Sequence, residues 1–258
     1  MSEQPPRQYQ PPPAPAGGPP YQQSARPAAV PGQPQMVAPP QMAAVDRVRV
    51  AAARRGETDY IFHYWPALGW TVLTFGIYGF YVFYQLVRRM RNHNARRLEL
   101  MDAATTVAWE HAGRQGLQQE LTPSFQRVAG HLAVLRRMTG DFREPVIWLL
   151  LAIVARGIAE VVGFVLLDQD LIKHSQAEAG AGYELSTIYA RLGQPLPARG
   201  QSQVKGPDNY AGRILATIFT FGIYLFWWFY NQMDEPNKHF ASDWAQEDDL
   251  VNAVNAVS

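Results

Sequence analysis

The sequence predicts an all-α membrane protein with about three membrane-embedded helical segments, several amphipathic helices and a disordered, proline-rich N-terminal tail. Apolar residues concentrate in three segments, 61–87, 146–167 and 211–230, and polar sequence separates them. Long apolar segments with aromatic residues near their ends are typical of membrane-embedded helices. One aromatic motif occurs twice, and 13 of the 20 prolines lie in residues 1–45.

The N-terminal region, residues 1–57, is predicted to be a disordered tail rich in Pro, Gln and Ala. Such a composition cannot bury enough apolar surface to offset the entropy lost on folding. We interpret the tail as a solvated spacer, since no basic residue accompanies a clean Pro-x-x-Pro core as in docking motifs. A membrane domain is expected over 58–250, followed by a short C-terminal end at 251–258.

The first embedded segment, 61–87, has two alternative structures. Its 27 residues (61 to 87) are enough for one tilted spanning helix of about 40 Å. Alternatively, Gly76-Ile77-Tyr78 forms the tip of a re-entrant hairpin, which the basic residues on both sides of the segment favour. The uninterrupted apolar length favours the spanning helix, which is the structure we predict.

The polar region 88–144 is predicted to form two amphipathic helices, the second beginning at Thr122-Pro123, where a cap residue precedes a proline. The region carries ten arginines, whereas residues 168–210 carry four basic residues. Because basic loops stay in the cytoplasm, we expect 88–144 to be cytoplasmic in a multi-pass protein of the cell membrane. A Pro/Gly linker is expected at 193–209.

Arg156 and Glu160 interrupt the second embedded segment, 146–167. Their spacing of four residues places both side chains on one face of a helix, where they can pair. Ionisable residues inside a membrane are costly and commonly functional. We therefore predict an intramembrane charge pair, for which a structural contact inside the bundle is the simplest role.

The motif Thr-Phe-Gly-Ile-Tyr occurs at two places 146 residues apart (76 to 222). Between 64–84 and 210–230, ten of 21 aligned positions are identical. Glycine in a lipid-facing helix lets another backbone approach closely, and buried tyrosine hydroxyls need partners. We therefore expect the two copies to pack together in one bundle. The motif and packing residues are Thr74, Gly76, Ile77, Tyr78, Thr220, Gly222, Ile223 and Tyr224.

This doubled motif, in which aromatic residues and a polar helix follow each copy, resembles a prokaryotic membrane family, domain-of-unknown-function family 4234. The further matching positions are Tyr81, Tyr84, Trp227 and Tyr230. The resemblance covers about residues 60–250 and leaves out the proline-rich tail. The second copy departs from the pattern, because Leu225 stands where the first copy has Gly79. The resemblance implies an integral membrane protein and no established activity.

No catalytic, cofactor-binding or metal-binding constellation is predicted. The chain has no cysteine, and its six histidines are dispersed without the spacing of metal ligands. His93 and His239 occupy equivalent positions after the two motifs, which we interpret as a shared capping or headgroup contact. A net charge of +1 gives no reason to expect a nucleic-acid partner.

These observations favour a non-enzymatic scaffold or regulatory membrane protein whose arginine-rich cytoplasmic helices engage partners. The alternative is a small transporter or channel subunit that uses Arg156 and Glu160. A lipid-modifying enzyme ranks third, because no catalytic constellation supports it. Membrane lipids are the expected partners, together with other proteins or further copies of the chain.

Overall fold

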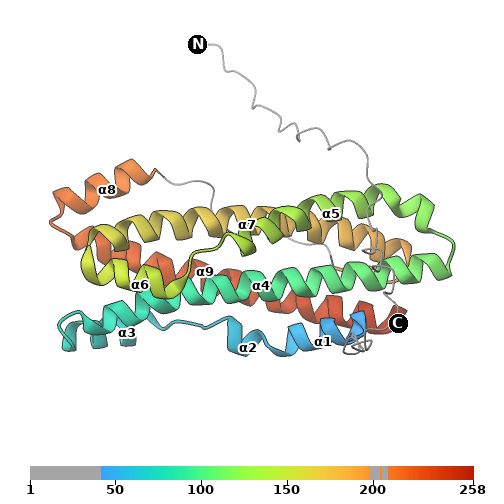
Figure 1. Cartoon of the computed structure of the whole chain (residues 1–258), viewed down its shortest axis with the longest axis horizontal. Coiled ribbons are helices and arrows are strands. Elements are labelled where there is room, and N and C mark those ends of the chain that lie inside the picture. The colour runs from blue at the N-terminus through green and yellow to red at the C-terminus, as the bar shows by residue number, and fades with distance from the viewer. Residues whose placement is uncertain (1–41, 198–203, 205–208) are drawn as a thin grey trace, which may run out of the picture. The chain divides into compact units, whose positions relative to one another are not determined.

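The computed structural model describes residues 42–197, 204 and 209–258, so residues 1–41 of the expected tail and most of the expected linker 193–209 lie outside the described residues. The described part is all-α, as the sequence predicts, and contains no strand. Its helices are α1 (Ala44–Ala53), α2 (Arg55–Thr58), α3 (Tyr64–Leu73), α4 (Ile77–Arg114), α5 (Gln118–Gly140), α6 (Pro145–Val154), α7 (Ile158–Arg191), α8 (Tyr210–Phe219) and α9 (Ile223–Val257) (Figure 1).

Three helical hairpins organise this bundle. In each hairpin a ten-residue apolar helix, α3, α6 or α8, leads through a tight turn into a long helix, α4, α7 or α9. Figure 1 shows the three turns at the same end of the bundle, with the long helices running away from them in one direction. The long helices contact one another, and α5 returns along α4 and α7 toward the turns. The bundle therefore has an apolar end, made by the turns, and an opposite end.

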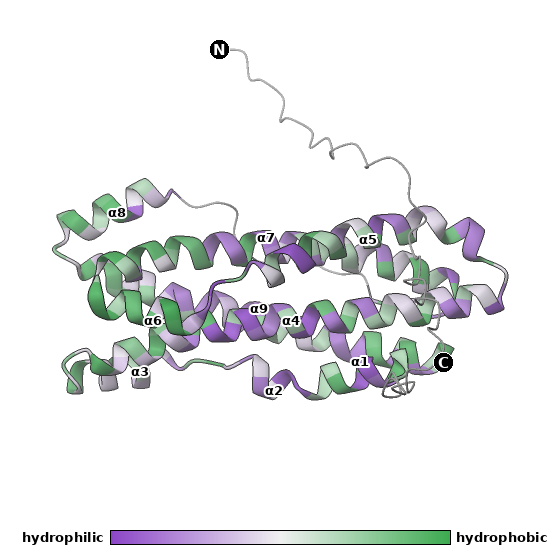
Figure 2. Cartoon of the chain, in the orientation of Figure 1, coloured by the Kyte–Doolittle hydropathy of each residue, from purple (hydrophilic) through white to green (hydrophobic). Residues whose placement is uncertain are grey.

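The core consists of two apolar clusters with a polar layer between them. The cluster near the turns includes Phe83, Phe164 and Trp228, and the cluster at the other end includes Leu100 and Ile188. Between them, buried charged and polar side chains come from α4, α7 and α9. The same change is visible in Figure 2, where the hairpin end is largely hydrophobic and hydrophilic residues gather along the middle.

The prediction of one spanning helix over 61–87 is wrong. The chain stops being helical at Thr74, takes left-handed backbone angles at Phe75 (φ 51°) and Gly76 (φ 91°), and begins α4 at Ile77. The amide of Gly76 bonds to the carbonyl of Thr71 at 2.7 Å, and that of Phe75 bonds to the carbonyl of Val72 at 3.1 Å. This pair of bonds is the Schellman arrangement that closes a helix C-terminus. An apolar run cannot reveal such a break, because every residue in it remains hydrophobic.

The third apolar segment has the same interruption. Phe221 (φ 51°) and Gly222 (φ 89°) separate α8 from α9, so 211–230 is also a hairpin. No helix in the described part of the chain combines the length and the hydropathy that crossing a membrane requires. The backbone at both motif copies therefore forms a hairpin and not one continuous helix.

Several expected helix boundaries also differ. α1 and all but the last residue of α2 fall inside the expected tail 1–57, where Val48 and Ala51 are buried and α1 packs on α4 and α9. In the region 88–144, α4 continues without a break to Arg114, and α5 begins at Gln118 with Pro123 inside it. α9 runs to Val257, past the expected end of the membrane domain. Burial against neighbouring helices stabilises these extensions, and this burial cannot be read from the local sequence.

Candidate functional site

The motif threonines bridge the two helix breaks. Thr74 Oγ1 donates to the carbonyl of Trp70 at 2.8 Å and accepts from the amide of Tyr78 at 2.9 Å. Thr220 Oγ1 makes the same two bonds, to Ala216 O at 2.7 Å and from the amide of Tyr224 at 3.0 Å. Each hydroxyl thus satisfies backbone groups on both sides of its turn. This double role explains why threonine occupies that position in both copies.

A third turn, also built around a glycine with positive φ but closed by other bonds, lies between α6 and α7. Gly157 has a φ of 86°, and its amide donates to Glu160 Oε2 at 2.5 Å, which caps the first turn of α7. The expected Arg156–Glu160 ion pair is absent from the described part, because α6 ends at Val154 and Arg156 lies in the turn, where the four-residue helical spacing does not apply. The Arg156 guanidinium instead lies over the Phe80 ring, 5.4 Å from its centroid.

The two motif glycines allow the left-handed backbone of their turns and do not contact each other. A Cβ at Gly222 would meet no heavy atom within 4 Å, whereas one at Gly76 would lie 2.2 Å from Nη2 of Arg156. The expectation of close backbone packing at these glycines is therefore wrong, and the positive φ values are the reason for both residues. Gly76, Gly157 and Gly222 nevertheless surround one apolar cavity of about 240 Å³, which Arg156 and Glu160 also line.

The copies do meet through their aromatic side chains. The hydroxyl of Tyr64 donates to the carbonyl of Phe226 at 3.2 Å, and the rings of Tyr64 and Tyr230 lie 5.2 Å apart. The rings of Phe164 and Phe229 stack at 6.2 Å, and Phe83 lies 6.2 Å from Phe164. The three hairpins therefore form one aromatic layer below the turns.

The outer surface of the turns is strongly apolar. Phe75 is 90% exposed, Val154 86% and Phe221 98%, and the isoleucines that begin the three long helices, Ile77, Ile158 and Ile223, are each 72% exposed. Within the described part of the chain, all but five of the exposed large apolar side chains lie on the hairpins, the exceptions being Met42, Val50, Tyr60, Val134 and Tyr183. Such a contiguous apolar surface marks an interaction site in a folded protein.

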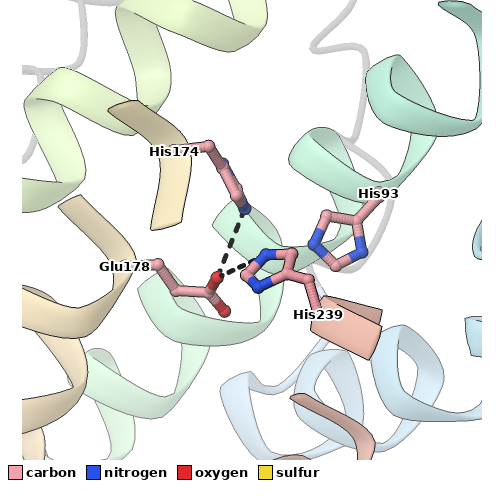
Figure 3. A group of neighbouring side chains, drawn as sticks. All are labelled: His93, His174, Glu178 and His239. Carbon is pink, nitrogen blue, oxygen red and sulfur yellow. Dashed lines mark ion pairs between the residues drawn. The ribbon is translucent and has the colours of Figure 1, made fainter. Parts of the chain in front are cut away.

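The polar layer contains three buried histidines in equivalent positions. In each long helix the histidine follows the turn glycine by 17 residues (76 to 93, 157 to 174, 222 to 239). His93 is 0% exposed, His174 1% and His239 7%. Figure 3 shows the Glu178 carboxylate next to His174 and His239, with His93 beside His239. Their centroids lie 5.2 Å (His93–His174), 5.4 Å (His93–His239) and 5.8 Å (His174–His239) apart.

The imidazole nitrogens converge with two carboxylates. Nε2 of His174 and Nε2 of His239 each lie 3.4 Å from Glu178 Oε2. Asp243 Oδ2 lies 3.2 Å from Nε2 of His239 and 3.5 Å from Nε2 of His93. One ligand atom from each of His93, His174, Glu178 and His239 can be chosen so that all four lie within 4.8 Å of one another. This is the one group in the described residues whose side chains could hold a metal ion.

Asp59 fixes the orientation of the first histidine. Its Oδ1 lies 3.0 Å from Nδ1 of His93, and its Oδ2 accepts from Arg96 at 2.6 Å and from Trp244 at 2.8 Å. Although burial alone would raise the pKa of Asp59, the contacts with His93, Arg96 and Trp244 hold it well below its usual range. Burial lowers the pKa of His93 to about 4 against the opposing effect of Asp59. His93 is therefore neutral at pH 7, with the proton on Nδ1 and the lone pair on Nε2.

Two arginines bond to the other glutamates of the layer. Glu178 Oε1 accepts from Arg97, while Arg96 and Arg97 donate to Glu247 Oε1 at 2.7 Å and 3.0 Å. Burial raises the pKa of Glu247 although both arginines oppose the shift. Burial lowers the pKa of His239, but the nearby Asp243 and Glu178 outweigh it, so the net shift is upward.

Sequence reasoning missed this cluster. It interpreted the equivalent His93 and His239 as a shared capping or headgroup contact, found no metal-ligand spacing among the six histidines, and did not find the third copy that contains His174. The detectable signal was the dipeptide Gly-Ile followed by histidine, since the glycine-to-histidine interval of 17 residues occurs in all three copies.

None of the protein-family models, curated proteins or solved structures compared with the chain matches it. The resemblance to family 4234 therefore remains a prediction that rests on the two motif copies.

Proposed function

We propose that the protein is a non-enzymatic membrane protein that inserts its three hairpin turns into one leaflet and keeps its long helices outside the hydrocarbon. The observation that carries this proposal is the exposed apolar surface of the three turns. A water-soluble surface rarely presents aromatic and aliphatic side chains at such exposure on adjacent turns. Acyl chains are the partner whose chemistry fits all three turns at once.

The hairpin length fits one leaflet. Each of α3, α6 and α8 has ten residues, which corresponds to about 15 Å of helix. The hydrocarbon core of a bilayer is about 30 Å thick, so the turns would lie near its midplane. Both arms of each hairpin then begin and end on the same side of the membrane.

The two motif turns also meet the main requirement of a backbone in hydrocarbon, which is that its polar groups have partners. The amide of Ile77 bonds to the carbonyl of Thr74 at 3.1 Å, in addition to the Schellman bonds and the threonine hydroxyl bonds. Two charged groups lie at the third turn. Arg156 is exposed, but its guanidinium lines the cavity and lies over the Phe80 ring, and the Glu160 carboxylate accepts from the Gly157 amide. These contacts lower the cost of both groups in a membrane.

The side of the membrane follows from charge. The region 88–144 carries ten arginines, and basic regions are retained in the cytoplasm. The bundle of long helices would then display its charged surface to cytoplasmic protein partners, which is a scaffold role. The transporter alternative loses its motivation, because it rested on an Arg156–Glu160 pair that does not form.

Single cysteines in this cysteine-free chain test the arrangement. Exposed positions Glu57, Glu110 and Asn252 lie outside the hairpins. One-leaflet insertion predicts that cysteines at all three sites react alike with an impermeant thiol reagent in intact cells and in inverted vesicles. A spin label at position 221 should be accessible to oxygen and shielded from a water-soluble nickel chelate. Opposite labelling of positions 57 and 110 would show that the first segment spans the membrane.

The energetic contribution of the turns is tested with liposomes. Removing two exposed phenylalanines, as in Phe75→Asn with Phe221→Asn, forfeits about 1.5–3 kcal/mol of apolar transfer for each side chain. Affinity of the purified protein for phospholipid vesicles should fall by about 100-fold or more. The control is Val134→Asn on α5, an exposed apolar residue outside the hairpins, which should bind like the unmodified chain. Equal binding by both variants would refute insertion through the turns.

A further inference from the structure

We propose that His93, His174, His239 and Glu178 bind one divalent first-row transition-metal ion of the iron-to-zinc group at the centre of the polar layer (Figure 3). Imidazole nitrogen and carboxylate oxygen are the ligands that these ions prefer, and three histidines with one carboxylate form a complete tetrahedral set. The inference stands on the core of the bundle and does not depend on membrane insertion.

The distances within the cluster fit such an ion. With metal–ligand bonds of about 2.0–2.2 Å, two ligands of a tetrahedral ion lie about 3.3 Å apart. Glu178 Oε2 lies 3.4 Å from Nε2 of His174 and 3.4 Å from Nε2 of His239. All four ligand atoms lie within 4.8 Å of one another, so the more distant ones have to move inward by about 1–1.5 Å for an ion to bind among them.

The ligand nitrogens are aimed at the centre. Nε2 of His93 and Nε2 of His174 are buried and make no hydrogen bond among the described residues. Their nearest acceptors are carboxylate oxygens, Asp243 Oδ2 at 3.5 Å from His93 and Glu178 Oε2 at 3.4 Å from His174, so both nitrogens face the acidic centre of the cluster. In His93 the opposite nitrogen, Nδ1, faces the Asp59 carboxylate at 3.0 Å, which leaves the Nε2 lone pair directed inward. A carboxylate behind a ligand histidine is the usual support of a metal-bound imidazole.

The charges of the layer also favour a cation. The acidic and basic groups linked by hydrogen bonds and ion pairs around the cluster are four acids, Asp59, Glu178, Asp243 and Glu247, and two arginines, Arg96 and Arg97, each at most 3% exposed. The buried Arg89, one turn closer to the hairpins, donates to Asn237 and to backbone carbonyls and also attracts Asp59. Acids therefore still outnumber arginines by four to three, and a cation reduces the cost of this buried excess.

The site takes its histidines from three different helices. α4, α7 and α9 each contribute one imidazole at the same interval from their turns, and α7 adds Glu178. A bound ion would thus join the three hairpins at one level. Because the site is buried and fully coordinated by protein side chains, its role is structural and not catalytic.

The test uses the full chain, purified in mild detergent with a tag that contains no histidine and freed of metal with a chelator. Addition of Co²⁺ should produce the intense visible absorption bands of a tetrahedral nitrogen–oxygen site and saturate at one ion per chain. Zn²⁺ should abolish these bands by replacement. Zn²⁺ alone should also raise the thermal unfolding midpoint, and renewed chelation should reverse the increase.

Variants assign the ion to this cluster. His174→Gln and His239→Gln should each weaken Co²⁺ binding by at least 100-fold, and Asp59→Asn, which leaves all four ligands in place, should weaken it 10- to 100-fold. The control is His63→Gln, an exposed histidine outside the cluster, which should bind Co²⁺ as tightly as the unmodified chain.

Two results would overturn the proposal. One is an unmodified chain that gives no cobalt bands and no zinc-dependent shift of the unfolding midpoint. The other is a set of bands that persists in both ligand variants, which would mean that cobalt binds elsewhere. If a ligand variant fails to fold, judged by its helical circular dichroism, the unmodified chain and Asp59→Asn decide the question by themselves.

Discussion

Alanine at Gly222 provides a direct measure of the helix break, because a glycine in a turn and a glycine in a helix respond to alanine with opposite signs. Gly222 has a φ of 89°, and a Cβ there would meet nothing within 4 Å. The change Gly222→Ala therefore introduces no clash and acts through the backbone alone. A left-handed conformation costs an L-residue about 1–2 kcal/mol, so the free energy of unfolding should fall by that amount.

Gly69 is the matched control. It lies inside α3 with a helical backbone, and a Cβ there would also meet nothing within 4 Å. Because alanine is the better helix former by about 0.8–1 kcal/mol, Gly69→Ala should raise the free energy of unfolding. The two variants differ from each other by about 2–3 kcal/mol, although each adds a single methyl group to an apolar segment.

Thermal and denaturant unfolding in one mild detergent, followed by circular dichroism, would measure both variants. If 211–230 were a continuous helix, alanine at position 222 would stabilise the protein as it does at position 69. An increase in stability for Gly222→Ala would therefore refute the hairpin. A decrease for Gly222→Ala together with an increase for Gly69→Ala would confirm it.

Three further outcomes are expected. Burial raises the pKa of Asp168 to about 6, against the opposing contacts with Trp228, Arg213 and Gln232. The folded state thus holds this proton more tightly than the unfolded state, so its contribution of about 3 kcal/mol is present below pH 4 and lost as the pH rises through 6. Asp168→Asn should remove this slope from the pH profile of unfolding. Tyr189→Phe deletes the bond from the Tyr189 hydroxyl to a backbone carbonyl of α4, 2.9 Å long, and should cost about 1–2 kcal/mol in denaturant unfolding. Cysteines at Gly79 and Leu225, which line the same cavity, should crosslink within one chain and change its migration on a denaturing gel, whereas failure with every reagent length would contradict that cavity.

The sequence was sufficient to predict what depends on local chemistry. The all-α class, the apolar segments and the doubled motif all follow from residue types and their spacing. The hairpin was also within reach, since basic residues flank 61–87 on both sides, but the length of the apolar run outweighed that signal. Phe75 explains the error, because an aromatic residue with a φ of 51° is a conformation that sequence statistics do not anticipate.

The buried polar layer depends on tertiary contacts and was not predictable in the same way. Glu178 of α7 lies against His239 of α9, and Asp59, a few residues before α3, lies against His93 of α4. These side chains meet only because the three hairpins align. The predicted Arg156–Glu160 ion pair does not form because a spacing of four residues brings two side chains together only within a continuous helix, and the turn interrupts the helix here. Both cases show that the position of the turns had to be known first.

The common interval of 17 residues fixes the distance between each turn and the histidine on the same helix. At 1.5 Å per residue, each histidine lies about 25 Å along its helix from the turn glycine. If the turns reach about 15 Å into hydrocarbon, the cluster lies about 10 Å outside it, beyond a headgroup region of roughly 6 Å. The histidines would then lie on the aqueous side, where ions have access. A shift of one residue in any copy would rotate its imidazole by about 100° around the helix and away from the other two. The interval of 17 residues therefore keeps the three turns at equal depth and also brings the three imidazoles together. This double requirement accounts for its recurrence in copies that otherwise differ.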